Sequence, residues 1–252
     1  MTVWSAGCGE PLASAPVPAV IPPLLDPPIG FAHRGARAHE RENTLEAFHL
    51  AARLGATGIE SDVWMSRDGQ AVLDHDGVVG PRWRRRPLAE FDRAELPDHM
   101  PLLAELYTEV GTDLPVSLDV KDAAAADEVV AVARRFGAAG QLWLCHPDLT
   151  TLIEWRERYP DVRLVDSTRH HRIEEGPERR AADLAAAGID AINLRHDDWK
   201  AGLVALFHRF GVLAFGWDAQ FERHMDELLD MGIDAIYSDH VDRMMARLND
   251  RY

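Results

Sequence analysis

The pentapeptide Gly-Ile-Asp-Ala-Ile at residues 188–192 recurs without change at residues 232–236. Each copy joins the end of a predicted helix to the start of a predicted strand, and its glycine stands where helices commonly end. A chain built from successive strand–helix units would repeat such a junction.

Apolar strands and amphipathic helices alternate around these two copies, from Ile29 to the C-terminus. The predicted strands cover residues 29–35, 58–65, 115–121, 142–146, 162–167, 191–194, 212–217 and 235–238. The predicted helices cover residues 44–54, 102–110, 124–136, 149–158, 177–187, 201–210, 222–231 and 241–248. A short return strand at 71–75 follows the turn signal Asp68-Gly69.

Strict alternation favours a parallel sheet with helices outside it. Eight units in about 220 residues are typical of a closed (β/α)8 TIM barrel of the α/β class. The alternative is an open, doubly wound sheet. Such a sheet usually has fewer units and a glycine-rich first turn, which this sequence lacks.

Two segments fall outside the alternating pattern. Residues 1–28 are rich in Pro, Ala and Gly, and we predict a tail that lies over the barrel or is partly disordered. Residues 77–100 form a short insertion after the second strand and contain the run Arg82-Trp83-Arg84-Arg85-Arg86. Residues 29–252 are therefore predicted to be one barrel domain.

The net charge of −15 argues against nucleic acids and anionic membranes as partners. No apolar run approaches the roughly 20 residues that span a bilayer. The two cysteines, Cys8 and Cys145, are predicted to be free thiols. We expect a cytoplasmic protein without a stable membrane anchor, a monomer or homodimer, that acts on a small molecule.

Two carboxylates on the second predicted strand share one face, because Glu60 and Asp62 are two residues apart. That face is predicted to point into the barrel mouth, where Asp119 ends the next strand. Converging carboxylates repel one another unless a counter-charge is present, and a hard divalent cation supplies one. A salt bridge with an arginine such as Arg34 is an equally good interpretation.

Two histidines, His33 and His75, are predicted to end strands beside those carboxylates. A pair of this kind suits a general acid and a general base on opposite sides of one bond. Arg34 and Lys121 suit the oxygens of a phosphodiester, or they balance the acids. Lys121 is one of only two lysines among 27 basic residues. Motifs of serine hydrolases, P-loop enzymes and dinucleotide oxidoreductases are absent.

These residues resemble the glycerophosphodiester phosphodiesterase family. The matching elements are His33-Arg34-Gly35, Glu42-Asn43-Thr44, the strand 58–63, Asp68-Gly69 and His75-Asp76, at the family's spacings. Residues 101–106, 117–121 and 232–239 also resemble family segments.

The resemblance implies a TIM barrel of the phospholipase C-like phosphodiesterase type, active in lipid metabolism. It implies hydrolysis of a glycerophosphodiester to sn-glycerol 3-phosphate and an alcohol, with His33 and His75 as the acid/base pair. It further implies that three carboxylates hold calcium or magnesium, that two cations and a tryptophan contact the substrate, and that two loop residues support the site. The residues so implied are Glu60, Asp62 and Asp119 for the metal, Arg34, Lys121 and Trp217 for the substrate, and Glu42 and Asn43 as supports.

The sequence departs from the family at a few positions. Arg41 stands where the family usually has proline, and Asp119 replaces a more usual glutamate. The segment 77–100 is short where relatives cap the glycerol end, and the run 82–86 could bind an anionic head group or be a solvated loop. Two other functions therefore stay open: a phospholipase D-like enzyme acting on lysophospholipids, and a non-catalytic phosphate-binding barrel.

Overall fold

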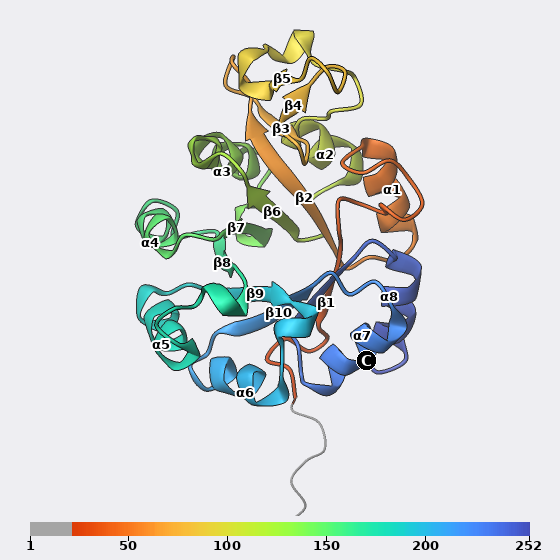
Figure 1. Cartoon of the computed structure of the whole chain (residues 1–252). Helices are drawn as coiled ribbons and strands as arrows, with labels where there is room; N and C mark the ends of the chain where they lie inside the picture. Colours follow the sequence, from red (N-terminus) through yellow and green to blue (C-terminus); the bar gives the residue numbers. More distant parts are fainter. Residues whose placement is uncertain (1–21) are drawn as a thin grey trace, which may run out of the picture.

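Parallel strands close into a ring in the computed structural model, which describes residues 22–252 (Figure 1). The hydrogen-bonded order is β1-β11-β10-β9-β8-β7-β6-β2, and the pairing of β1 with β2 closes the ring. The barrel strands are β1 (Ile29–Ala32), β2 (Gly58–Met65), β6 (Val116–Val120), β7 (Leu142–His146), β8 (Arg163–Ser167), β9 (Ala191–Arg195), β10 (Leu213–Trp217) and β11 (Ala235–Ser238). The predicted TIM barrel is confirmed, and the open sheet is excluded.

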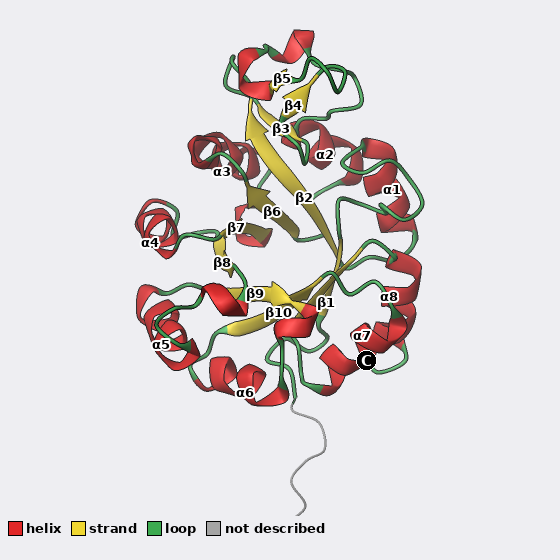
Figure 2. Ribbon diagram, in the orientation of Figure 1, coloured by secondary structure: helices red, strands yellow, loops and turns green. Residues whose placement is uncertain are grey.

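Helices surround the strands on the outside (Figure 2). Within residues 22–252 they are α1 (Leu45–Arg53), α2 (Leu103–Val110), α3 (Ala126–Arg135), α4 (Leu149–Arg158), α5 (Pro177–Ala187), α6 (Ala201–Arg209), α7 (Glu222–Asp230) and α8 (Val241–Asn249). Thr44 caps α1 by accepting a hydrogen bond from the Ala47 backbone N–H. Among the described residues, no helix has the length and apolarity needed to cross a membrane.

Side chains fill the barrel in alternation along each strand. Phe31, Phe215 and Tyr237 pack inside with Trp143, and the Phe31 and Tyr237 rings stack at 4.8 Å. Gly58 makes room for this layer, since a Cβ atom there would lie 2.5 Å from the Phe31 ring. The aromatic layer lies below the C-terminal strand ends, and the polar groups that line the cavity at those ends lie above it.

The repeated pentapeptide fastens neighbouring strands, as repeated units require. Asp190 accepts a hydrogen bond from the Leu164 N–H of β8, and Asp234 accepts one from the Ala214 N–H of β10. Asp234 also accepts from the N–H groups of Leu24 and Leu25, which places residues 22–28 across the N-terminal end of the barrel. The rest of the predicted tail, with Cys8, lies outside the described residues.

The segment after β2, which includes the insertion 77–100, contains short strands and 3-10 helices. β3 (Ala71–Leu73) pairs antiparallel with β2, and β4 (Val78–Val79) pairs with β5 (Arg86–Pro87) in a hairpin. Two 3-10 helices follow, Leu88–Glu90 and Arg93–Glu95. Together they bury a separate apolar cluster of Val72, Leu88, Leu96 and Met100. The arginine run is exposed at the turn of the hairpin.

A buried ion pair joins β8 to α5, and no pattern in the sequence indicated it. Asp166 is fully buried, and one of its carboxylate oxygens lies 3.3 Å from Nε of Arg180. Burial raises the pKa of Asp166 to about 7, although the charge of Arg180 opposes this rise. The carboxylate therefore depends on this arginine for its charge balance.

We expect Arg180→Leu to lower the free energy of unfolding by about 3–5 kcal/mol at pH values well above 7, where Asp166 would be an unpaired buried carboxylate. This loss of stability should shrink as the pH falls. The pKa of Asp166 is higher in the folded protein than in the unfolded chain, so an ionised Asp166 is destabilising only above its unfolded pKa. Urea denaturation at several pH values measures both effects. The double variant Asp166→Leu/Arg180→Leu should be more stable than Arg180→Leu, and equal stability of Arg180→Leu and the unsubstituted protein would contradict the prediction.

Candidate active site

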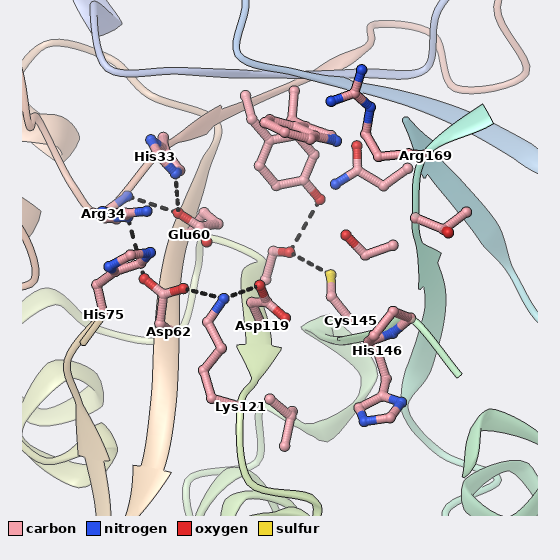
Figure 3. Close-up of a pocket in the computed structure, with 18 of the residues that line it drawn as sticks. His33, Arg34, Glu60, Asp62, His75, Asp119, Lys121, Cys145, His146 and Arg169 are labelled. Atoms are coloured by element: carbon pink, nitrogen blue, oxygen red, sulfur yellow. Dashed lines mark hydrogen bonds and ion pairs between the residues drawn. The ribbon is translucent and has the colours of Figure 1, made fainter. Parts of the chain in front are cut away.

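Polar side chains from the strand ends surround one cavity of about 550 Å³ at the C-terminal rim of the barrel (Figure 3). Of the predicted site residues, eight line this cavity: His33, Arg34, Glu60, Asp62, His75, Asp119, Lys121 and Trp217. Glu42 and Asn43 lie beside it and line a neighbouring cavity that shares His75. The structure thus brings together residues from opposite ends of the chain.

The loop after β1 owes its shape to two residues with positive φ. Arg34 has φ 51° and Gly35 has φ 78°, so the chain leaves the barrel in a tight turn rather than continuing the predicted strand to residue 35. A Cβ atom on Gly35 would lie 2.8 Å from the backbone of Ala47 in α1. The turn aims the Arg34 backbone N–H at Oε2 of Glu60, 2.8 Å away.

Three carboxylates line one side of the cavity. Glu60 and Asp62 point inward from β2 and are only 6% and 2% exposed, whereas Ile59 and Val63 pack outside the barrel. Asp119 stands beside Asp62 in the register of β2 and β6. Burial raises the pKa of Glu60 to about 7, and the charge of Asp62 adds to this rise while His33 opposes it. The site therefore holds more negative charge than it easily accommodates.

Two cations balance part of that charge. Nζ of Lys121 lies 3.1 Å from Asp62 and 2.5 Å from Asp119. Nε of Arg34 lies 3.3 Å from Asp62. Burial opposes the charge of Lys121, but Asp119 and Asp62 together raise the pKa of its ammonium. Both cations occupy the charge-balancing role that the sequence left open for them.

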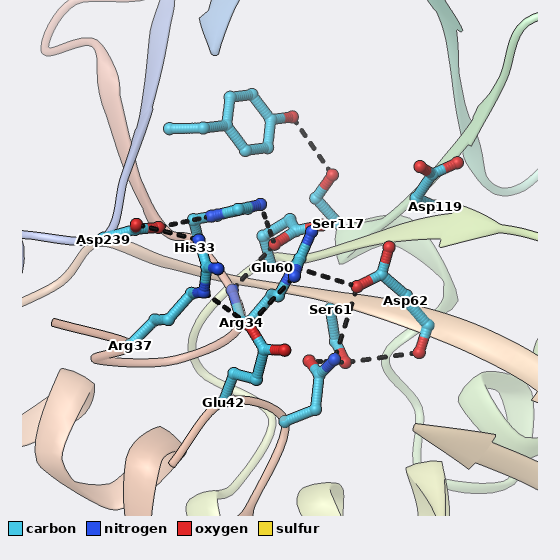
Figure 4. Close-up of polar contacts among 12 residues, drawn as sticks. His33, Arg34, Arg37, Glu42, Glu60, Ser61, Asp62, Ser117, Asp119 and Asp239 are labelled. Carbon is cyan, nitrogen blue, oxygen red and sulfur yellow. Dashed lines mark hydrogen bonds and ion pairs between the residues drawn. The ribbon is translucent and has the colours of Figure 1, made fainter. Parts of the chain in front are cut away.

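His33 is oriented by the carboxylate of Asp239, which follows the last strand (Figure 4). Its Nδ1 lies 2.5 Å from Oδ1 of Asp239, and its Nε2 lies 3.9 Å from Oε2 of Glu60. Burial alone would lower the pKa of His33, yet Glu60 and Asp239 raise it. Burial raises the pKa of Asp239, but the hydrogen bond to His33 and the charge of His33 lower it, so the pKa is lowered overall. The carboxylate of Asp239 is therefore ionised and can only accept a hydrogen bond. Nδ1 is therefore the donor, and Nε2 is left to exchange a proton in the cavity.

His75 lies beside Asp62 and Arg34 and is more exposed than His33 (Figure 3). Its Nδ1 lies 2.9 Å from Asp76, and Asp76 in turn contacts Arg85 at 3.3 Å. The arginine run of the insertion therefore touches the site through Asp76. The carbonyl of His75 accepts a hydrogen bond from the Trp64 indole, which fixes the loop.

The two predicted supporting residues contact the ring of charged groups from outside. Glu42 accepts a hydrogen bond from Arg34 at 2.9 Å and also contacts Arg37. Asn43 donates to Asp62 at 3.3 Å and accepts from Ser61 at 2.8 Å. Each therefore positions a residue that faces the cavity.

The trio Glu60, Asp62 and Asp119 offers the hard oxygen donors that calcium and magnesium prefer. A cation would also offset the burial that raises the pKa of Glu60. The ammonium of Lys121 already lies between the two aspartates and supplies part of the positive charge there. Within residues 22–252, the carboxylate oxygens of this trio do not all lie within 4.8 Å of one another. A different group of possible metal ligands meets that condition, namely His39, His240 and Asp242.

Sequence reasoning missed several groups that the closed ring brings to the site. Asp239 and Arg37 form a pair at 3.0 Å behind His33. Ser117 lies on the cavity floor, 3.1 Å from the Tyr237 hydroxyl. Asp239 had a visible signal, since it follows the last strand, which lies beside the first strand in any closed barrel.

Comparisons with known proteins agree with this geometry. The model of the "Glycerophosphoryl diester phosphodiesterase family" matches residues 33–243. The "Probable glycerophosphodiester phosphodiesterase 2" of Mycobacterium tuberculosis is 28% identical over 247 residues, which cover 85% of this chain and 88% of that protein.

Two solved structures share the fold. A glycerophosphodiester phosphodiesterase from Thermotoga maritima has a TM-score of 0.75 and 22% identity, covering 86% of this chain and 97% of that one. An Oleispira antarctica phosphodiesterase, in complex with the product sn-glycerol-3-phosphate, has a TM-score of 0.77 and 19% identity, covering 88% and 97%. Because the family match runs from His33 at the end of β1 into α8, the chain belongs to the glycerophosphoryl diester phosphodiesterase family.

Proposed function

We propose that this protein hydrolyses a glycerophosphodiester to sn-glycerol 3-phosphate and an alcohol. The family supports this proposal, and so does the relative from Oleispira antarctica that was solved with that product. The observation that carries it is the cavity itself, where two histidines, three carboxylates and two cations face one another.

The residues divide the chemistry in a simple way. Arg34 and Lys121 would bind the non-bridging oxygens of the phosphate and stabilise their charge in the transition state. One histidine of the pair His33 and His75 would remove a proton from the attacking hydroxyl as its oxygen bonds to phosphorus. The other would donate a proton to the leaving oxygen as its bond to phosphorus breaks.

A divalent cation, calcium or magnesium, would be held by Glu60, Asp62 and Asp119. When bound, it would supply positive charge to the phosphoryl oxygens. Lys121 would then give up part of its contact with the two aspartates and turn toward the substrate. Asp119 is one methylene shorter than the glutamate that the family usually has, which leaves room for a water between it and the cation.

The attacking hydroxyl belongs either to water or to the glycerol of the substrate. Attack by water gives glycerol 3-phosphate directly, whereas attack by the neighbouring hydroxyl first gives a cyclic phosphate. Phosphorus NMR during the reaction separates the two, because only the second route accumulates a cyclic diester.

Purified protein with calcium or magnesium should release glycerol 3-phosphate from glycerophosphoglycerol or glycerophosphocholine. Treatment with a chelator should abolish turnover, and adding back the cation should restore it, because the three carboxylates would otherwise repel the phosphate. An enzyme-coupled assay for glycerol 3-phosphate measures both steps. Full activity in the chelated protein would contradict the metal assignment, and no cleavage of any diester with any divalent cation would contradict the function.

A second candidate is hydrolysis of lysophospholipids, and one observation favours it. Trp83 is 87% exposed at the hairpin turn, next to four arginines. An exposed tryptophan among cations suits the interface of an anionic lipid surface. Comparing turnover of a lysophospholipid with that of its deacylated diester, before and after Trp83→Ala, distinguishes the two substrates.

A further inference from the structure

The cavity has two chemically different sides. The side built from β1, β2 and β6 carries every carboxylate that lines it, namely Glu60, Asp62 and Asp119. The side built from β7 to β10 is lined by Cys145, His146, Pro147, Ser167, Thr168, Arg169, Arg172, Asn193 and Trp217. In Figure 3, Arg169 and His146 lie across the cavity from Asp62 and His75. Among its described lining residues this second side has no acid, although the chain carries a net charge of −15.

Two arginines on that side differ in how their charge is balanced. Nε of Arg169 lies 2.6 Å from Asp198, and its guanidinium lies 5.8 Å from the Trp217 ring. Arg172 ends the 3-10 helix His170–Arg172, three residues further on, and its exposed side chain makes no ion pair within residues 22–252. Arg169 is thus a fixed donor, and Arg172 is a cation whose charge is unmatched.

A third group points to a ligand independently of charge. Oδ1 of Asn193 on β9 is buried, and it has no hydrogen-bond partner in the described structure. The residue is 5% exposed and lines the same side of the cavity. A buried acceptor without a donor costs stability, so a hydroxyl group from a ligand would satisfy it.

We infer that this side of the cavity binds the leaving half of the diester, and that Arg172 selects a leaving alcohol that carries its own negative charge. This inference rests on the proposed function. The glycerol half of the substrate is uncharged, so it offers no partner for two arginines. Arg169 and Arg172 would therefore bind the leaving alcohol, which is the half that differs between glycerophosphodiesters. Asn193 accepts a hydroxyl of that alcohol, while Arg169 and Arg172 bind its anionic group, a phosphate or a carboxylate.

Three matched diesters test the inference, and all have glycerol 3-phosphate as the common product. The leaving alcohol is glycerol in the first, glycerate in the second and glycerol phosphate in the third. We expect kcat/KM to be at least about tenfold higher for a charged leaving half than for the neutral one, as one charge-assisted hydrogen bond would give. The second and third substrates distinguish a carboxylate from a phosphate.

Substitution of Arg172 should change the preference for charged over neutral leaving alcohols, and not only the overall rate of hydrolysis. The ratio of kcat/KM between the charged and neutral diesters should fall about tenfold in Arg172→Ala, be largely restored in Arg172→Lys, and drop below one in Arg172→Glu. Arg135→Ala is the matched control. It removes the same charge from an exposed arginine at the end of α3, and should leave the ratio as it is.

Calorimetric binding of the same three diesters to the His33→Ala variant, with the cation present, needs no turnover, so it separates this inference from the proposed function. Tighter binding of the charged diesters, lost in Arg172→Ala, supports the inference even in a protein that cleaves nothing. A wild-type protein that cleaves all three diesters equally, or a ratio that Arg172→Ala does not move, overturns the inference and leaves the proposed function standing. Arg172→Ala could instead bind anionic vesicles more weakly while the ratio of kcat/KM between charged and neutral diesters stays unchanged. That result would assign Arg172 to a lipid surface and would also overturn the inference.

Discussion

Replacing either His33 or His75 with alanine is expected to lower kcat for a glycerophosphodiester by about 10²–10⁴-fold, the usual contribution of a positioned acid or base. The two variants should then respond differently to an activated leaving group. A diester that releases p-nitrophenol needs no proton on its leaving oxygen, because the phenolate is stable at neutral pH. We therefore expect this substrate to rescue the variant that lacks the general acid, and not the variant that lacks the general base.

Steady-state kinetics with the glycerol diester and the p-nitrophenyl diester measure this difference. His49→Ala is a matched control, since His49 lies on α1 and contacts Glu109 at 3.7 Å, away from the cavity. Circular dichroism would establish that each variant is folded. If both histidine variants kept more than about a tenth of the wild-type rate, the two-histidine mechanism would be wrong. If both were rescued equally, neither histidine would act as the base.

The second large effect is expected for Asp62→Asn. Asp62 is buried and is the carboxylate that contacts both Arg34 and Lys121, at 3.3 Å and 3.1 Å. Because Asp62 is a proposed metal ligand, loss of its charge should remove several kcal/mol of charge stabilisation. This corresponds to a decrease of about 10²–10⁴-fold in kcat/KM. The amide keeps the size of the side chain, so the effect would come from charge.

Titration of activity with calcium or magnesium, together with calorimetric measurement of metal affinity, shows how the loss arises. We expect a weaker affinity and a lower rate at saturating metal. Asp113→Asn, which removes the same charge from an exposed loop, is the control. A large loss of rate with unchanged affinity would assign Asp62 to the positioning of Arg34 and Lys121 rather than to the metal.

The strand β2 is an element that local sequence predicts correctly. Its bounds, its inward face and the juxtaposition of Glu60 with Asp62 all follow from a period of two residues, and the structure confirms them. The end of β1 shows where local sequence stops. The apolar pattern predicted a strand to Gly35, but the strand ends at Ala32 because Arg34 and Gly35 adopt positive φ and turn the chain onto α1.

The insertion gives the same lesson on a larger scale. Its sequence has no period, because its apolar residues serve a cluster assembled from the hairpin, the 3-10 helices and β3. Such a cluster is defined by packing between short segments, and no single segment carries a signal long enough to detect.

The sequence by itself determined that the chain is a barrel, which strand ends carry the chemistry, and which residue types meet there. Those properties are local, since each depends on periodicity or on a motif within a few residues. Only the tertiary structure decided which groups touch. Asp239 holds His33 across 206 residues, Asp166 depends on Arg180 of the helix outside, and Arg172 lines the same cavity as the acids. The contact of Asp239 with His33 exists because closing the ring sets β11 beside β1, and no local pattern records the distance between those strands.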